Sequence, residues 1–140
     1  LIGKGSEAAG EWGNGIVSYE EMKYAMRSCR AYFYTGTYPA SYTLNFIEAL
    51  MTGMPMVALG PLMGNSPYHH EQQTYEVPDF SNGGHDIMLV DTIAEAQAAV
   101  RLLMESPILA AQMSVRSRKL AIDLFGKETI KKQWKRFFNV

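Results

Sequence analysis

The residues best placed for chemistry lie where an apolar run passes through a polar loop into a helical segment. The run 31–34 (Ala-Tyr-Phe-Tyr) is typical of a β-strand, 36–43 of a loop and 44–52 of a helix. In a parallel α/β sheet, ligands bind at the carboxyl ends of the strands, and the unpaired amides of a helix N-terminus there attract phosphate. We therefore expect a diphosphate near residues 43–45, which are Thr, Leu and Asn.

A carboxylate one turn into this helix is well placed for a ribose. Glu48 follows Leu44 by four residues, so the two side chains share one face of the helix. A carboxylate set back from a phosphate site can accept hydrogen bonds from both ribose hydroxyls. The spacing alone also allows a plainer interpretation, in which Ser41 or Thr43 only caps the helix and Glu48 only faces solvent.

Other groups of reactive side chains give weaker signals. In the His-His-Glu run at 69–71, adjacent side chains point in different directions and no further ligand cluster accompanies them, so we expect no metal. Ser18, Ser41 and Ser66 lack the glycine pattern of a nucleophile elbow, which argues against a hydrolase. These patterns assign no residue a catalytic role.

Alternating strand and helix patterns predict an α/β domain with a mostly parallel sheet and helices on both faces. The expected strands are 1–3, 15–17, 31–34, 56–59 and 86–90, with loops at 7–15 and 60–84 and a short helix near 69–75. The expected helices are 19–28 after the cap Ser18, 44–52, one opened by a Thr92–Glu95 capping box, one from Pro107 to Gly126, and a last one reaching Phe138.

Composition limits the class of protein. The chain has 140 residues, 47% of them hydrophobic and 19% charged, which indicates one globular domain over residues 1–140. A net charge of −1 gives no general attraction to nucleic acid. Cys29 is the single cysteine, and the sequence shows neither a signal peptide nor an apolar run near 20 residues. We therefore expect a cytoplasmic protein, and the opening residues indicate a fragment cut at the edge of a domain.

The helix at 44–52 and the strand after it resemble the donor-site signature of the retaining GT-B glycosyltransferases known as family 4. The residues that match in register are Leu44, Glu48, Ala49, Gly53, Pro55, Val57 and Ala58. In that family the matching Glu binds the ribose of the donor, which implies this role for Glu48. The backbone before the helix holds the diphosphate, which implies Thr43, Leu44 and Asn45.

Further segments extend this resemblance over nearly the whole chain. The stretch 15–22 is similar to the family's strand and helix beside the nucleotide base, which places Val17 and Tyr19 there. The loop before the helix adds Gly36, Ser41 and Tyr42 to the expected donor site. The stretches 82–84 and 87–91 are similar to the family's later strand, and Ser106-Pro107 with the helices after it is similar to the family's C-terminal tail.

The resemblance implies the Rossmann-like, donor-binding C-terminal half of a GT-B enzyme, with a helical tail. Such a domain binds a nucleotide diphosphate sugar without a metal, while an N-terminal domain, here expected upstream with the first strands, holds the acceptor. The family's first Glu falls at Ala40, near the transferred sugar, and its glycines fall at Ser41 and Thr43. Ala40 favours one alternative, a non-catalytic sugar-nucleotide-binding module. A GT-B-fold sugar-nucleotide epimerase is the other.

The expected last helix is basic on one face and aromatic on another. The basic residues are Lys127, Lys131, Lys132, Lys135 and Arg136, and the apolar ones include Trp134 and Phe137. Three interpretations remain open at this point: a helix that lies on a membrane surface, one that docks against the upstream domain, and one that closes the core with a solvated basic face.

Overall fold

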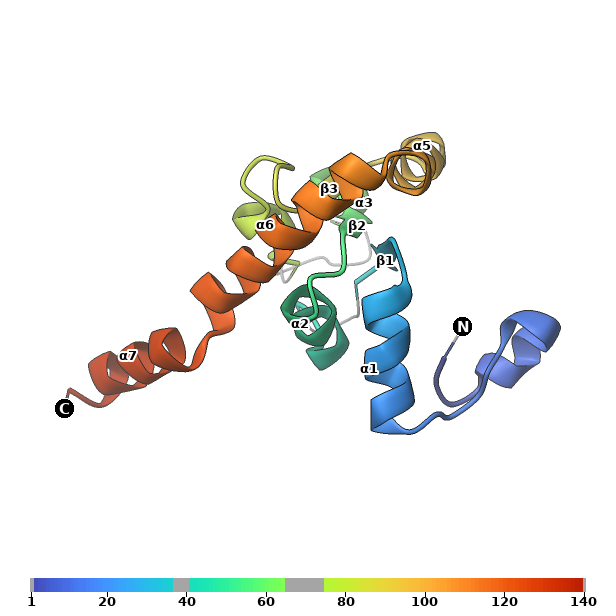
Figure 1. Ribbon diagram of the computed structural model, residues 1–140. Coiled ribbons are helices and arrows are strands. Elements are labelled where there is room, and N and C mark those ends of the chain that lie inside the picture. Colours follow the sequence, from blue (N-terminus) through green and yellow to red (C-terminus); the bar gives the residue numbers. More distant parts are fainter. Residues whose placement is uncertain (1, 37–40, 65–74, 140) are drawn as a thin grey trace.

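Parallel strands form the centre of the domain in the computed structural model, which describes residues 2–36, 41–64 and 75–139 (Figure 1). Strands β1 (Tyr32–Tyr34), β2 (Met56–Leu59) and β3 (Met88–Val90) lie side by side in that order. Phe33 pairs with Val57, and Val57 pairs with Met88. The expected strands at 31–34, 56–59 and 86–90 are thus present, and the first and last of them begin later than expected, at Tyr32 and Met88.

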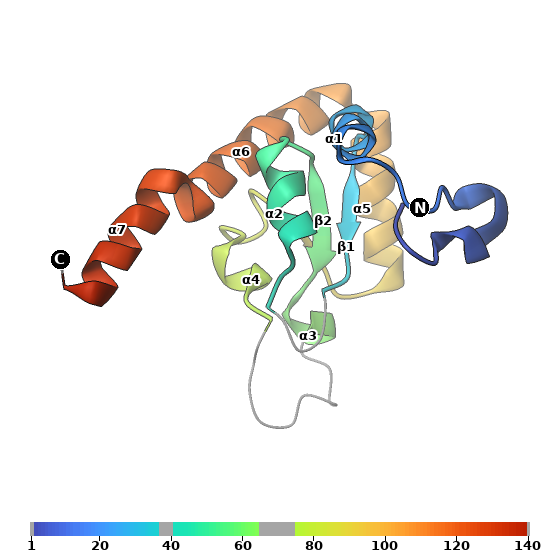
Figure 2. The ribbon, with the colours of Figure 1, turned by 90° about the horizontal axis from the view of Figure 1, so that it is seen from below.

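Helices cover both faces of this sheet (Figure 2). Successive side chains of the buried strand β2 point to opposite faces, so Met56 and Ala58 meet one core cluster and Val57 the other. The first cluster includes Phe46, Ala49 and Leu50 of α2 (Leu44–Met51). The second includes residues of α5 (Ile93–Glu105) and of α6 (Pro107–Phe125). The predicted α/β fold with a parallel sheet is confirmed, and the arrangement is compatible with a Rossmann-like fold.

The remaining helices are short or lie at the ends of the chain. They are the 3-10 helix η1 (Ser6–Trp12), α1 (Tyr19–Ser28), α3 (Pro61–Gly64), α4 (Val77–Phe80) and α7 (Lys127–Phe138). The stretch 60–84, expected to be a loop, therefore contains α3 and α4. Except for Tyr75, the short helix expected near 69–75 lies outside the described residues.

Side-chain caps explain why the helix starts could be predicted. Ser18 Oγ accepts a hydrogen bond from Glu21 N at 3.3 Å, and the Glu21 carboxylate accepts from Ser18 N at 2.8 Å. The hydrogen bonds from the Ser18 side chain and backbone lower the pKa of Glu21. At α5 the expected box is only half formed. Thr92 Oγ1 accepts from Glu95 N at 3.1 Å, but the Glu95 carboxylate accepts from Asp91 N instead of Thr92 N.

The substitution Thr92→Ala should lower the free energy of unfolding by about 1 kcal/mol, because it removes the acceptor for an otherwise unpaired amide of α5. Urea unfolding followed by circular dichroism measures this loss. Thr129→Ala, in the first turn of α7, is the matched control and should stay within about 0.5 kcal/mol of the original chain. Equal effects of the two substitutions would contradict the capping role.

The expected strands at 1–3 and 15–17 do not form in the described residues. Gly3 N donates to Gly15 O at 2.7 Å, and Gly15 N donates to Ser6 Oγ at 2.9 Å. The polar groups of Gly15 are therefore bound by the N-terminal segment instead of a sheet neighbour. Ile16 is left 75% exposed. The prediction of a loop at 7–15 is also wrong in part, because most of these residues belong to the 3-10 helix η1.

Helix α7 extends from the end of α6 away from the sheet (Figure 1). None of its described residues is buried, and Trp134, Phe137 and Phe138 contact one another at its surface. The interpretation that this helix closes the core is therefore wrong, and the other two remain predictions. Among the described helices, none is both long enough and apolar enough to cross a membrane.

Candidate functional site

The carboxyl ends of β1 and β2 and the N-terminus of α2 lie at the same end of the domain (Figure 2). Thr43 caps α2, because its Oγ1 accepts a hydrogen bond from Phe46 N at 3.4 Å. The first amides of an α-helix, here those of Leu44 and Asn45, have no partner within the helix. With the helix dipole, they form a partly positive end that suits an anion such as phosphate.

The predicted ligand residues of α2 lie on the side that the core leaves open. Phe46 and Ala49 are fully buried against the sheet. Leu44 is 76% exposed, Asn45 is exposed, and Glu48 is half-buried. A ligand with a phosphate at the first turn of α2 could therefore extend along the surface of the helix and place a second group at Glu48.

A polar cleft between α1 and α2 contains Glu48. It has a volume of about 210 Å³ and is lined by Tyr19, Met22, Lys23, Met26, Arg27, Glu48, Met51, Thr52 and Arg118. Tyr19 and Glu48, 29 positions apart in the sequence and both predicted to bind the donor, therefore line one cavity. The structure adds three cationic side chains, two from α1 and one from α6.

The cations of this cleft differ in how firmly they are held. Arg118 Nη1 donates to Met51 O at 2.5 Å, which fixes it at the end of α2. Lys23 pairs with Glu20 at 2.6 Å and lies 4.7 Å from the centre of the Tyr19 ring. In the described part of the chain, Glu48 forms no ion pair with these cations or with any other residue. Its carboxylate can therefore accept hydrogen bonds from a ligand.

Sequence reasoning did not identify Lys23, Arg27 or Arg118. Lys23 and Arg27 follow Tyr19 by four and eight residues, so the three side chains could have been expected on one face of a helix. Arg118 gave no such signal, since it reaches the cleft only because α6 packs on α2.

Two other residues predicted to bind the donor, Tyr42 and Gly36, take part in packing. The centre of the Tyr42 ring lies 5.3 Å from that of the Phe125 ring, and both rings pack against the first core cluster. Gly36 has φ +78°, and a Cβ added there would lie 3.1 Å from the Tyr75 ring. Val17 is half-buried just before α1 and does not line the cleft.

Ser41 is half-buried just before the Thr43 cap. Its contact with the donor stays a prediction. Ala40, Ser66 and the His-His-Glu run at 69–71 lie outside the described residues.

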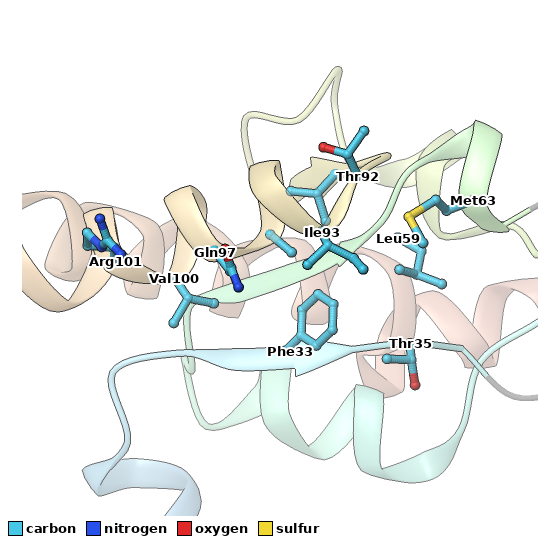
Figure 3. Close-up of a pocket in the computed structure, with 11 residues that line it drawn as sticks. Phe33, Thr35, Leu59, Met63, Thr92, Ile93, Gln97, Val100 and Arg101 are labelled. Atoms are coloured by element: carbon cyan, nitrogen blue, oxygen red, sulfur yellow. The ribbon is translucent and has the colours of Figure 1, made fainter.

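A second, larger cavity lies between β1 and α5 (Figure 3). Its volume is about 740 Å³, and it is lined by Phe33, Thr35, Leu59, Met63, Val90, Thr92, Ile93, Ala96, Gln97, Val100 and Arg101. The apolar side chains of α5 differ in exposure there: Leu103 is fully buried, whereas Ile93, which lines the groove, is 73% exposed. Arg101 is the only cation among the described residues that line the groove, so the groove suits an apolar group better than a diphosphate.

No described group of His, Cys, Asp or Glu side chains has the number and proximity needed to hold a metal ion.

Neither a protein-family model nor a curated protein matches the chain. The geometry of the α2 N-terminus and of the adjoining cleft therefore carries the functional interpretation.

Proposed function

We propose that this domain binds a nucleotide diphosphate sugar and serves as the donor-binding part of a glycosyltransferase. The diphosphate would lie at the N-terminus of α2, against the first amides of the helix. The ribose would lie one turn further on, with its hydroxyls donating to Glu48. The support for this proposal is that a helix N-terminus and a half-buried carboxylate, which forms an ion pair with none of the described residues, lie on one open side of the helix.

The observation that carries the proposal is a division of roles among the residues that resemble the family signature. Ala49, Val57 and Ala58 are fully buried, so the fold alone explains them. Leu44 and Glu48 match the same signature, yet neither belongs to the buried core. A ligand-binding role accounts for these two residues where packing does not.

In this proposal, the domain assists transfer by stabilising the leaving nucleoside diphosphate. Charge develops on the diphosphate as the glycosyl bond breaks, and oriented amides at a helix N-terminus stabilise that charge without having to reorient. The acceptor would be held by another domain. No residue of this chain is given a catalytic role.

A non-catalytic sugar-nucleotide-binding module is the second candidate function. It is favoured by one observation, the presence of Ala40 where the resembling family has a Glu beside the transferred sugar. Both functions require the same nucleotide site. Transfer of a sugar to an acceptor by a protein that contains this domain would decide between them.

The test of the shared site is calorimetric titration of the chain with UDP, GDP and ADP. At least one should bind, and Glu48→Ala should weaken it about 10- to 100-fold, because hydrogen bonds to a charged group contribute roughly 1.5–3 kcal/mol. Glu128→Ala, an exposed carboxylate on α7, is the matched control and should leave the affinity unchanged. No binding, or equal affinity after Glu48→Ala, would contradict the proposal.

A further inference from the structure

Hydrogen-bond donors from two helices line the cleft that contains Glu48. Lys23 and Arg27 reach it from α1, and Arg118 reaches it from α6. Lysine and arginine side chains donate hydrogen bonds and accept none. Thr52 donates its hydroxyl proton to Ala49 O at 2.8 Å, so its oxygen can only accept a hydrogen bond from a ligand. Apart from Glu48, the charged groups that line this cleft are therefore donors.

The order of these groups along α2 matches the order of the parts of a nucleotide. The helix starts at Leu44, Glu48 lies one turn later, and Met51 and Thr52 follow after about another turn of roughly 5 Å. A diphosphate at the start and a ribose at Glu48 leave the base next to Met51 and Thr52. That is the end of the cleft where Arg118 is fixed to Met51 O.

The cleft also has the size and the surfaces for a single ring system. Its volume of about 210 Å³ is below the roughly 300–1,000 Å³ of sites that enclose a drug-sized ligand. Tyr19 is 57% exposed and lines the cleft with Met22 and Met26. The face of the ring that Lys23 does not cover offers a stacking surface that accepts any base. Stacking would hold the base without selecting among bases, so selection would come from the donors.

We propose that the α1–α2 cleft is a base pocket that selects bases rich in carbonyl acceptors, namely uracil or guanine, over adenine and cytosine. This inference rests on the proposed nucleotide site and names its substrate class. Arginine donates two parallel hydrogen bonds to O6 and N7 of guanine. The carbonyl oxygens of uracil are likewise acceptors. Adenine and cytosine place an amino group where guanine and uracil have a carbonyl, and a guanidinium has no acceptor for it.

Arg27 is the informative position for a test, because Arg118 also holds the end of α2. Arg27 is exposed, so Arg27→Met keeps much of the side-chain length, removes the donors, and leaves the core untouched. Arg27→Lys keeps the positive charge but loses the two-pronged donor geometry. Arg136→Met, on the exposed helix α7, is the control. Thermal unfolding of each variant shows whether its fold is retained.

Calorimetry with UDP, GDP, ADP and CDP measures the selection. UDP or GDP should bind at least about 10-fold more tightly than ADP and CDP, since a good pair of hydrogen bonds to a base contributes roughly 1–3 kcal/mol of discrimination. Arg27→Met should remove most of this difference, and Arg27→Lys should reduce it, whereas Arg136→Met should preserve it.

The results that overturn this inference differ from those that overturn the nucleotide site. ADP or CDP binding as tightly as UDP and GDP, with affinity still dependent on Glu48, would reject base selection alone. An Arg27→Met variant that weakens all four nucleotides equally would show that Arg27 attracts only the diphosphate, and would also reject it. Failure of every nucleotide to bind would reject both proposals.

Discussion

Replacing Phe46 with alanine should lower the free energy of unfolding of the domain by about 3–5 kcal/mol. The side chain is fully buried, and its ring centre lies 4.9 Å from that of Tyr34, 5.8 Å from Tyr42 and 6.1 Å from Phe80. Removing it leaves a cavity between α2 and the sheet that its neighbours can fill only in part. Because small domains are stable by roughly 5–15 kcal/mol, this loss is a large fraction of the total.

Urea unfolding followed by tyrosine and tryptophan fluorescence measures the effect. Phe137→Ala is the matched control, because it deletes the same ring at a position that is 74% exposed on α7. The control should change the free energy of unfolding by no more than about 0.5 kcal/mol. A loss below about 1 kcal/mol for Phe46→Ala would mean that α2 does not pack on the sheet as described.

Signals that act over a few residues were readable from the sequence. The starts of α1, α2 and α6 were predicted at the right positions because each has a capping side chain, which accepts a hydrogen bond from the backbone amide three residues later. The capping residues are Ser18, Thr43 and Ser106. The continuous apolar run at 56–59 predicted strand β2, which the structure buries between the two core clusters. These features supply the α2 N-terminus and place Glu48 one turn into the helix, which is the local half of the candidate site.

Features that depend on contacts between distant segments were not readable. A run such as 15–17 becomes a strand only if a sheet edge pairs with it, and here its first residue bonds to the N-terminal segment. The apolar side chains of α7 have helical spacing, but spacing does not say what covers them. Arg118 joins Glu48 only through the packing of α6 on α2, so the cationic end of the cleft could not be predicted.

Gly53, which follows α2 and matches the family signature, illustrates how a residue of that signature can serve the fold. Gly53 has φ +78°, Gly53 N donates to Leu50 O at 2.9 Å, and Met54 N donates to Ala49 O at 3.0 Å. This is the Schellman arrangement that ends a helix with a left-handed residue. A Cβ at Gly53 would lie 2.9 Å from Ser114 Oγ and 3.3 Å from Ser114 O of α6. The glycine thus allows α2 and α6 to approach closely.

Gly53→Ala should therefore lower the free energy of unfolding by about 2–4 kcal/mol. The left-handed conformation contributes roughly 1–2 kcal/mol of this cost, and the close approach to α6 contributes the rest. Gly83→Ala separates the two terms, because Gly83 has φ +63° and no atom within 4 Å of the added Cβ. This control should show only the conformational cost.

A second substitution tests the contact itself. Ser114→Ala removes the nearest atom, Oγ, so the pair Gly53→Ala and Ser114→Ala together should cost less than the sum of the two single changes. Arg118 lies one helical turn after Ser114 and holds Met51 O, so separating α6 from α2 also moves a cation away from Glu48. Urea unfolding of the four chains measures the coupling. If Gly53→Ala costs no more than Gly83→Ala, or if the two changes simply add, α2 and α6 do not meet at this contact.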